Sequence, residues 1–477
     1  MRTPRLSIGT LVALAALSCA CLEARGQGGT RSWPSWLHGC TIAETSESAL
    51  CGVVTVPESA GQAAGRTIGI HVTVVPARAA NAEADPILLL AGGPGQGAAT
   101  LARQLSARVG HIRDRFDLLL IDQRGTGQSN GLQCNAPGAT ADVMGRIFDH
   151  AGLAACRDQL SRRADLTKYT TATSAADYEI IFDALAVRQV HVWGVSYGTR
   201  LGYEIARRIP DRVRTLTLES VVPVTFNWPS TGARDLDAAL NAVIDDCIAN
   251  TACASAYPDL RRDVDAAFSR LQSRPIDVNV IDPATGAPAR VQFSWMDLAY
   301  ATRGILYGDG SRLPALFRDA ARGNYDGFGQ AYVTRARTLD QQIAPGLLFG
   351  VYCAEDLPFV DWAAANQAAA GTRIGAYLLE QYRRGCDVWP QASIPDGFRD
   401  PTRVDVPTLM FSGRHDPVTP PRTAEEAARY LPRSRRLIWK YGGHGVDGTP
   451  SATCRNRMVA EFMTTADPSR IDTGCMN

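Results

Sequence analysis

A serine between glycines is the strongest chemical signal in the chain. It lies in the pentapeptide Gly194-Val195-Ser196-Tyr197-Gly198, which fits the pattern G-x-S-x-G of a serine on a sharp turn between a strand and a helix. The glycines are required because a side chain in so tight a turn would clash with the neighbouring backbone. An apolar run at 190–195 precedes Ser196, and a helical pattern at 199–209, stopped by Pro210, follows it. This context predicts that Ser196 is a nucleophile.

A second stretch fits the same pattern without the same surroundings. Gly127-Gln128-Ser129-Asn130-Gly131 lies among other glycines, and no helical pattern directly follows it. The nucleophile position needs the strand and the helix as well as the glycines. We therefore expect Ser129 to be a structural serine in a loop.

A serine nucleophile needs a base to take its proton and an acid to orient that base. When the serine follows a strand-turn-helix pattern, the order along the chain is serine, acid, histidine. The histidines after residue 404 are His415 and His444. His444 lies in a glycine-flanked loop directly after an apolar run, where such a base should emerge. The sequence predicts His444 as the base.

Asp416 is the predicted acid. It lies just beyond the apolar run Thr408–Phe411 and precedes the predicted base in the chain. Asp405 and Asp356 are weaker alternatives, since neither follows a strand of the predicted core. The three groups together predict acyl transfer, in which Ser196 attacks an amide or ester carbonyl.

The loop Ala91-Gly92-Gly93-Pro94-Gly95-Gln96-Gly97-Ala98 allows two interpretations. It fits a loose dinucleotide-binding pattern after an apolar run, with Asp122 at the end of the next run. Pro94 weakens that alternative, because it removes a backbone donor where a pyrophosphate would need several. Beside a catalytic serine, the loop would instead help to form an oxyanion hole from the N–H groups of Gly93 and Tyr197.

The elements that would position these groups alternate between strands and helices up to about residue 219. This pattern predicts a doubly wound, mostly parallel α/β sheet. The clearest predicted strands are Ile87–Leu90, Asp117–Ile121, Val190–Trp193, Thr215–Leu218, Thr408–Phe411 and Leu437–Trp439. Helical periodicity dominates between the fourth and fifth of these strands. We expect a core at 25–222 and 405–477, with a mainly helical lid at 223–404 inserted into it.

The N-terminus indicates export. Two arginines among the first five residues precede an apolar stretch at 11–17 and a group of small residues, which predicts a signal peptide at 1–24. The apolar stretch is too short to span a bilayer. We expect a periplasmic or extracellular protein with no integral membrane segment in the mature chain. A lipoprotein signal with Cys19 or Cys21 as the lipidated residue is the weaker alternative.

The cysteines also indicate an exported protein. Of the 12 cysteines, two lie within the predicted signal, and an even number remains, as expected for disulfide bonds. The simplest pairing joins neighbours in the sequence: Cys40–Cys51, Cys134–Cys156, Cys247–Cys253, Cys353–Cys386 and Cys454–Cys475. The cysteine spacing does not fit a zinc site, so we expect no metal. The net charge of +1 gives no reason to expect a nucleic-acid partner.

Together these motifs resemble the secreted tripeptidyl aminopeptidases and proline iminopeptidases of the α/β-hydrolase fold. The resemblance rests on the segments Gly92–Gly95, Asp122–Ser129 and Gly194–Thr199, and on the surroundings of Asp416 and His444. It implies an α/β-hydrolase fold with the inserted lid, and no metal or organic cofactor. It also implies an aminopeptidase that releases short N-terminal residues or tripeptides from peptides. The chain departs from the family pattern at Ala91, where many relatives carry histidine, and at Gln96-Gly97.

An aminopeptidase needs an acidic group to hold the substrate ammonium. By resemblance, Glu355 and Asp356 are candidates for substrate binding, although they could equally be helix-end carboxylates beside a disulfide. A carboxylesterase that uses the same triad on small esters is one alternative function. A non-catalytic binding protein on the same fold is a second. The expected partner is a peptide or a small amide or ester.

Overall fold

The computed structural model describes residues 32–42, 45, 47–59, 65–104, 109–134, 150–338, 342–447 and 449–476. The predicted signal peptide and the two cysteines of the lipoprotein alternative lie outside these residues. Within the described ranges, no helix combines the length and the apolar composition that crossing a membrane requires.

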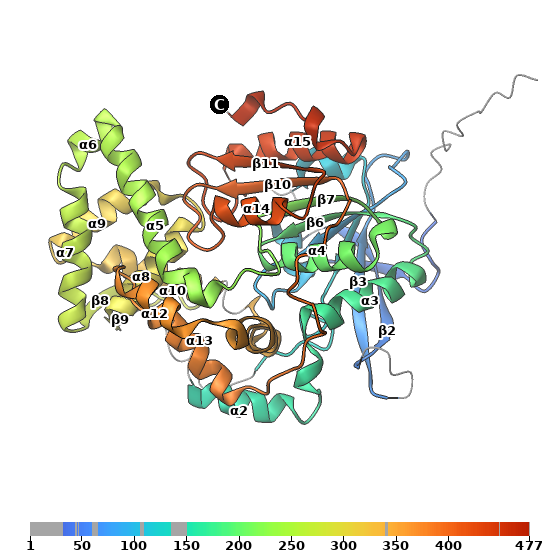
Figure 1. Ribbon diagram of the computed structural model, residues 1–477, viewed down its shortest axis with the longest axis horizontal. Coiled ribbons are helices and arrows are strands. Elements are labelled where there is room, and N and C mark those ends of the chain that lie inside the picture. The colour runs from blue at the N-terminus through green and yellow to red at the C-terminus, as the bar shows by residue number, and fades with distance from the viewer. Residues whose placement is uncertain are drawn as a thin grey trace, which may run out of the picture.

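A nine-stranded sheet forms one half of the molecule, in the order β1-β2-β3-β5-β4-β6-β7-β10-β11 (Figure 1). Its strands are β1 (His38–Thr41), β2 (Ser48–Pro57), β3 (Thr67–Val75), β4 (Ile87–Leu90), β5 (Leu118–Ile121), β6 (Val190–Val195), β7 (Val213–Glu219), β10 (Thr408–Gly413) and β11 (Ser434–Trp439). Neighbours from β5 to β11 run parallel, whereas β1, β2 and β3 join antiparallel at one edge. The predicted doubly wound, mostly parallel sheet is confirmed.

Helices cover both faces of this sheet, as its apolar strands require. The period of two along a strand sends alternate side chains to opposite layers. Leu88 and Leu90 of β4 pack with α3 (Thr171–Ala184), α4 (Tyr197–Arg208) and α14 (Pro421–Ala428). The other two residues of the strand, Ile87 and Leu89, pack on the opposite face with α15 (Ser451–Thr465).

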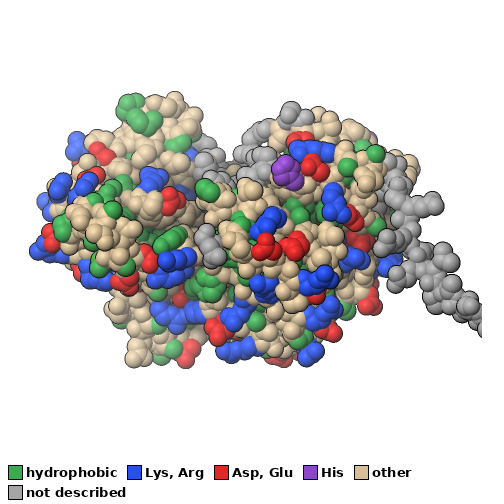
Figure 2. Space-filling view, turned by 90° about the horizontal axis from the view of Figure 1, so that it is seen from above, with side chains coloured by type: hydrophobic (Ala, Val, Ile, Leu, Met, Phe, Trp, Pro, Cys, Tyr) green, Lys and Arg blue, Asp and Glu red, His purple; other side chains and the backbone are tan. Residues whose placement is uncertain are grey.

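Between β7 and β10 the chain leaves the sheet and builds a second region, which we call the helical region. Its elements are α5 (Trp228–Ala249), α6 (Thr251–Ala256), α7 (Leu260–Ser273), α8 (Trp295–Leu306), α9 (Leu313–Ala321), α10 (Asp326–Thr338), α11 (Pro345–Val351), α12 (Trp362–Ala370) and α13 (Tyr377–Val388), with the hairpin β8 (Ile276–Ile281) and β9 (Pro288–Phe293). It lies beside the sheet, and a notch in the surface separates the two regions on the face seen in Figure 2. Basic and acidic side chains are interspersed on that face.

The disulfide bonds join the cysteines that are neighbours in the sequence. All five predicted pairs, with loops of 6 to 33 residues, are present. Two of them, Cys247–Cys253 and Cys353–Cys386, lie in the helical region. Disulfides of this kind are typical of proteins outside the reducing cytosol.

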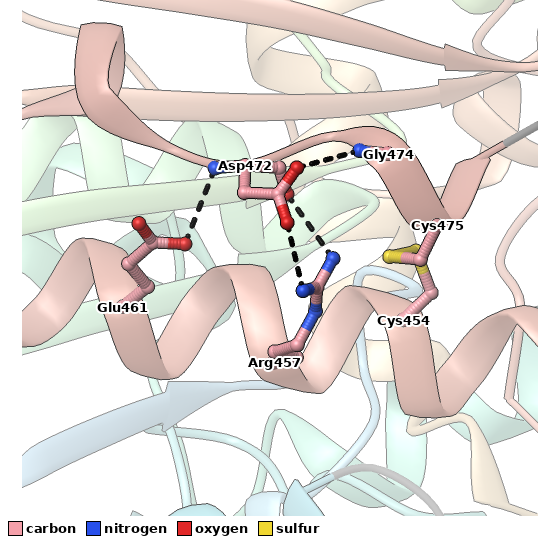
Figure 3. The surroundings of a disulfide bond; sticks show 6 residues. All are labelled: Cys454, Arg457, Glu461, Asp472, Gly474 and Cys475. Carbon is pink, nitrogen blue, oxygen red and sulfur yellow. Dashed lines mark hydrogen bonds and ion pairs between the residues drawn. A yellow bond between two sulfur atoms is a disulfide. The ribbon is translucent and has the colours of Figure 1, made fainter.

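The last disulfide ties the C-terminal segment to α15 (Figure 3). Arg457 on the helix forms an ion pair with Asp472, with 2.9 Å between Nη1 and Oδ2. Glu461, one turn further along, accepts a hydrogen bond of 3.2 Å from the Asp472 N–H. Polar contacts and the covalent bond of Cys454 to Cys475 therefore hold the same segment on one helix face.

Candidate active site

Ser196 lies at the sharp turn between β6 and α4. Its φ of 55° and ψ of −126° fall outside the regions that residues with a side chain normally adopt. The Ser196 N–H donates to the Glu219 carbonyl at 2.9 Å, and Thr199 donates to the Ser196 carbonyl from both its N–H and its hydroxyl. Residues held in such strained conformations cluster at functional sites, where the surroundings fix them.

Close packing explains the glycines on either side of this serine. A Cβ atom on Gly194 would lie 2.4 Å from the carbonyl oxygen of Gly198. A Cβ atom on Gly198 would lie 2.4 Å from the carbonyl oxygen of Leu90 and 2.6 Å from that of Ala91. Both contacts are with backbone atoms of the turn or of the end of β4, which cannot move aside as a side chain could. The turn that presents Ser196 therefore requires both glycines.

Ser129, the serine of the second glycine pattern, is placed differently. Its side chain is completely buried, and its hydroxyl oxygen accepts a 2.8 Å hydrogen bond from the His71 N–H. Its N–H donates to the Thr126 carbonyl within a tight loop. These contacts give Ser129 a structural position in a loop at the end of β5.

Asp416 and His444 meet at the ends of β10 and β11. The Nδ1 atom of His444 lies 3.0 Å and 2.9 Å from the two carboxylate oxygens of Asp416. Three further donors fix that carboxylate: the N–H groups of Val418 and Thr419, each at 2.8 Å, and the Thr419 hydroxyl at 2.6 Å. A carboxylate that binds Nδ1 favours the tautomer in which Nε2 is free to accept a proton.

The ionisation of Asp416 follows from the same contacts. Complete burial acts to raise its pKa. This rise is outweighed by the charge of His444 and by the hydrogen bonds from His444 and Thr419, which lower the pKa. The net result is a pKa below the ordinary value for aspartate. Asp416 is therefore a carboxylate at neutral pH, as an orienting acid must be.

The helical region also positions His444. The His444 N–H donates to the carbonyl of Tyr307 at 3.0 Å, and the two rings lie 4.4 Å apart. The buried Nε2 atom has no hydrogen-bond partner among the described residues. In structures without substrate, catalytic hydrogen bonds are often longer than in the reacting complex. His444, whose Nε2 is thus free, lines the same cavity as Ser196.

Two cavities meet at the serine. The larger, of about 810 Å³, is lined by Ser196 and His444 and by side chains of α8, α10 and α13. The smaller, of about 30 Å³, extends from Ser196 towards Arg200 and Asp356. The residues that line both cavities are Gly93, Ser196, Arg303, Tyr307 and Tyr352.

The glycine loop after β4 lies directly against the serine. A Cβ atom on Gly92 would lie 3.1 Å from the Ser196 Cβ, so the loop approaches as closely as glycine allows. Gly93 follows with a φ of +111°, and Tyr197 is the first residue of α4, where N–H groups have no acceptor within the helix. The two predicted oxyanion donors thus belong to segments on either side of Ser196.

Asp122, which the dinucleotide alternative would assign to a ribose, binds the backbone instead. Its carboxylate accepts hydrogen bonds from the N–H groups of Ala99, at 3.1 Å, and Gln128, at 2.9 Å. It therefore joins the glycine loop to the loop after β5. Among the described residues, no group of histidine, cysteine, aspartate and glutamate side chains could hold a metal ion.

The two candidate substrate-binding carboxylates lie next to each other but in different environments. They end a π-helix, Tyr352–Asp356, a form of helix that is frequent at functional sites. Asp356 lines the smaller cavity and pairs with Arg200 at 3.1 Å and with Arg399 at 3.4 Å. Glu355 lines neither of the two cavities described above and is completely buried.

Thr171, the first residue of α3, holds the carboxylate of Glu355. Its two carboxylate oxygens accept hydrogen bonds from the N–H and hydroxyl of Thr171, at 2.6 Å and 2.8 Å. Burial raises the pKa of Glu355 to about 7, although the charge of Arg200 and the Thr171 bonds act against this rise. The same Thr171 hydroxyl lies 2.8 Å from the hydroxyl of Tyr197. Glu355 is thus linked through Thr171 to the side chain of Tyr197, whose N–H is a predicted oxyanion donor.

Several cavity residues were not predicted from the sequence. Thr419, which bonds Asp416, lies only three positions after it, and its hydroxyl in that turn was an available signal. Arg303 and Tyr307 gave no such signal, because they lie far from the motifs in the sequence. Tyr352 lies next to Cys353 of a predicted disulfide, but nothing in its own position marked it as a cavity residue. The fold alone brings them to the serine.

Two curated relatives match most of the chain, and a third matches part of it. Serine protease Hip1 of Mycobacterium tuberculosis is 24% identical over 438 residues, which cover 80% of this chain and 79% of the relative. Tripeptidyl aminopeptidase of Streptomyces coelicolor is 24% identical over 464 residues, covering 89% and 82%. Proline iminopeptidase of Xylella fastidiosa is 26% identical over 141 residues, covering 30% and 34%. The resemblance inferred from the motifs is confirmed.

A model of the alpha/beta hydrolase fold matches residues 85–446. The match begins just before β4 and ends just after the predicted base, so it contains every element that carries the site. The chain belongs to the α/β-hydrolase fold family.

Proposed function

We propose that the protein is an exported serine hydrolase of the aminopeptidase type, which forms an acyl-enzyme on Ser196. One observation carries the proposal: a strained serine shares a cavity with a histidine whose Nδ1 binds a buried carboxylate. The N-terminal pattern and the disulfides support export. The relatives, a serine protease and two kinds of aminopeptidase, support peptide substrates.

The proposed reaction proceeds in two halves. The Nε2 atom of His444 takes the proton of the Ser196 hydroxyl while the oxygen attacks the substrate carbonyl, and the oxyanion accepts from the Gly93 and Tyr197 N–H groups. The leaving amine receives the proton from His444. Water then gives a proton to His444 and attacks the acyl-enzyme. His444 returns this proton to the Ser196 oxygen as the bond between that oxygen and the acyl carbon breaks and the acid leaves. Asp416 remains ionised and stabilises the imidazolium in both halves.

The smaller cavity is our proposed site for the substrate ammonium. A cavity of about 30 Å³ has room for a group the size of one water molecule. Asp356 lines it, together with Ser196 itself, and would offer the negative charge that a free N-terminus needs. Residues 223–404 would act as the lid, because side chains of α8, α10 and α13 wall the larger cavity in front of the serine.

A matched panel of substrates tests this function. It contains aminoacyl and tripeptidyl amides with a free amine, their N-blocked versions, and simple aryl esters, with Ser196→Ala as the control. We expect cleavage of the free-amine amides and none by the variant. Cleavage of esters alone would retain the triad and refute the peptidase. Failure of a fluorophosphonate to label Ser196 would refute the hydrolase and favour a binding protein.

A further inference from the structure

Arg303 is a cation in the candidate site that the proposed mechanism does not use. It lies on α8, four residues before Tyr307, and lines both the larger and the smaller cavity beside Ser196. This guanidinium and Ser196 therefore border the same two cavities, which a substrate at the serine would enter. Its environment therefore bears on which substrates the site accepts.

Aromatic side chains hold this guanidinium in place. Its central carbon lies 4.7 Å from the ring centre of Trp228 and 5.1 Å from that of Tyr307. Its Nη2 donates a 2.7 Å hydrogen bond to the Tyr307 hydroxyl. Aromatic rings stabilise a cation but take none of its directional hydrogen bonds. The buried Nε–H has no acceptor among the described residues.

The carboxylates that line the cavities make their contacts with groups other than Arg303. Asp356 pairs with Arg200 and Arg399. Asp447 pairs with Arg455 at 2.6 Å, and Asp309 accepts hydrogen bonds from Ser311. Across the described part of the chain, Arg303 forms an ion pair with none of them. A desolvated charge without a partner is costly, which gives a reason for a partner to arrive with the substrate.

We propose that Arg303 binds a carboxylate of the substrate next to the scissile bond. The inference rests on the proposed function and narrows its substrate class to acidic peptides. The carboxylate has two possible sources: an aspartyl or glutamyl side chain on the residue that acylates Ser196, or the C-terminus of a very short leaving peptide. A planar guanidinium held between aromatic rings is pre-organised for a carboxylate, so little entropy is lost on binding. Asp356 and Arg303 would then hold opposite charges of one substrate.

Matched substrates test the proposal on the unaltered protein. The first arm compares glutamyl with glutaminyl amides, and aspartyl with asparaginyl amides, each with a free amine. The second compares short peptides that end in a carboxylate with the same peptides ending in an amide. A hydrogen bond between charged groups predicts a preference in kcat/KM of about 10-fold to 100-fold for the acid in one arm. Equal kcat/KM values in both arms would overturn the proposal.

Variants of Arg303 separate recognition from folding. Arg303→Gln should lower kcat/KM more for the acidic substrate of each pair than for the neutral one, so that the preference for the acid disappears. Arg303→Lys should retain part of the preference, because the charge remains while the planar fork is lost. Arg274, exposed at the end of α7, provides the matched control, and Arg274→Gln should keep the full preference. Equal losses on acidic and neutral substrates in Arg303→Gln would indicate a purely structural arginine.

A binding experiment keeps the two proposals apart. Calorimetry with Ser196→Ala and the same acid and amide peptides measures affinity without turnover. Tighter binding of the acidic peptide supports the carboxylate site even where the peptidase assignment fails. A different outcome would separate the proposals in the other direction. If fluorophosphonate labels Ser196 and neutral amides are cleaved, but neither kcat/KM nor affinity favours the acidic peptides, the carboxylate site is refuted and the proposed function remains.

Discussion

The sheet and the helical region contribute to the site in different ways. The sheet carries the proposed reacting groups on short turns at the ends of β6, β10 and β11, where backbone geometry fixes each side chain. The helical region provides the walls, through side chains such as Arg303, Tyr307 and Tyr352. Under the proposed function, the reaction type would follow from the sheet, whereas substrate choice would follow from the helical region.

The division is not complete, because the helical region touches the catalytic loops. The Tyr307 carbonyl holds the His444 N–H at 3.0 Å, and the Ala344 N–H donates to the Gly95 carbonyl at 2.9 Å. A shift of the helical region would therefore move the base and the glycine loop. The predictions below test how far the chemistry and the walls can be separated.

Removal of the nucleophile should have the largest effect. Ser196→Ala should lower kcat by at least about 10⁴-fold, because the acyl-enzyme can no longer form. Stability should stay nearly unchanged, since the structure shows no hydrogen bond from this hydroxyl to any described residue. Steady-state kinetics and thermal unfolding measure the two effects. If kcat falls by less than 100-fold, the role of Ser196 as nucleophile is refuted.

The backbone of the nucleophile turn should tolerate no added methyl group. Gly198→Ala places a Cβ atom 2.4 Å from the Leu90 carbonyl oxygen, and we expect a loss of about 4 kcal/mol in the free energy of unfolding. Gly371 in the helical region offers the control, since a Cβ atom there would meet nothing within 4 Å. Gly371→Ala should change stability by less than about 0.5 kcal/mol. Urea unfolding compares the two, and equal effects would contradict the steric argument.

Disulfides in the two regions should differ in their effect on activity. Loops of 33 residues for Cys353–Cys386 and 21 for Cys454–Cys475 predict losses of about 3 kcal/mol each when the cysteines are replaced by alanine. The first bond lies in the π-helix that carries Asp356, so its removal should also lower kcat/KM about 10-fold. Removal of the second should leave kcat/KM unchanged. An equal loss of kcat/KM on removal of either disulfide would show that the helical region has no greater influence on activity than the C-terminal segment.

The sheet could be predicted because its signals are local. Each parallel strand is a short apolar run buried on both faces, and the order serine, acid, histidine then selects Ser196, Asp416 and His444. The structure places Asp416 in contact with His444, and His444 lines the same cavity as Ser196. The antiparallel edge was also encoded locally, in alternations such as Val54 and Val56 on β2, which are buried between exposed neighbours.

The side chains of the helical region that line the cavities could not be predicted, because their positions depend on tertiary contacts. Arg303 belongs to an ordinary helical pattern, and its meaning arises from Trp228, 75 positions earlier (303 − 228), which closes over it in space. The hairpin β8–β9 was missed for a related reason: it lies within a segment dominated by helical periodicity. As a substrate-binding group, Asp356 was predicted only through resemblance. Which of the two adjacent carboxylates borders the cavity depends on the π-helix, which the sequence did not reveal.

The smallest predicted effect concerns Glu355, where the helical region meets α3. Burial raises its pKa to about 7 in the folded state, above the ordinary value of 4.5, so the folded protein binds more protons between these values. Its contribution to stability is then present below pH 4.5 and is lost as pH rises through 7. Between pH 5 and pH 7.5 this loss should amount to about 2 kcal/mol, and Glu355→Gln should remove it.

Glu380 in the same region provides the matched control for this titration. Hydrogen bonds from Arg383 and Arg384 lower its pKa to about 2, so it remains ionised throughout the range. Glu380→Gln should leave the slope of unfolding free energy against pH unchanged, whereas Glu355→Gln should flatten it. Urea unfolding at half-unit steps of pH measures both slopes. If Glu355→Gln keeps the slope of the unaltered protein, Glu355 is a carboxylate throughout, and the charge beside the Tyr197 hydroxyl does not change with pH.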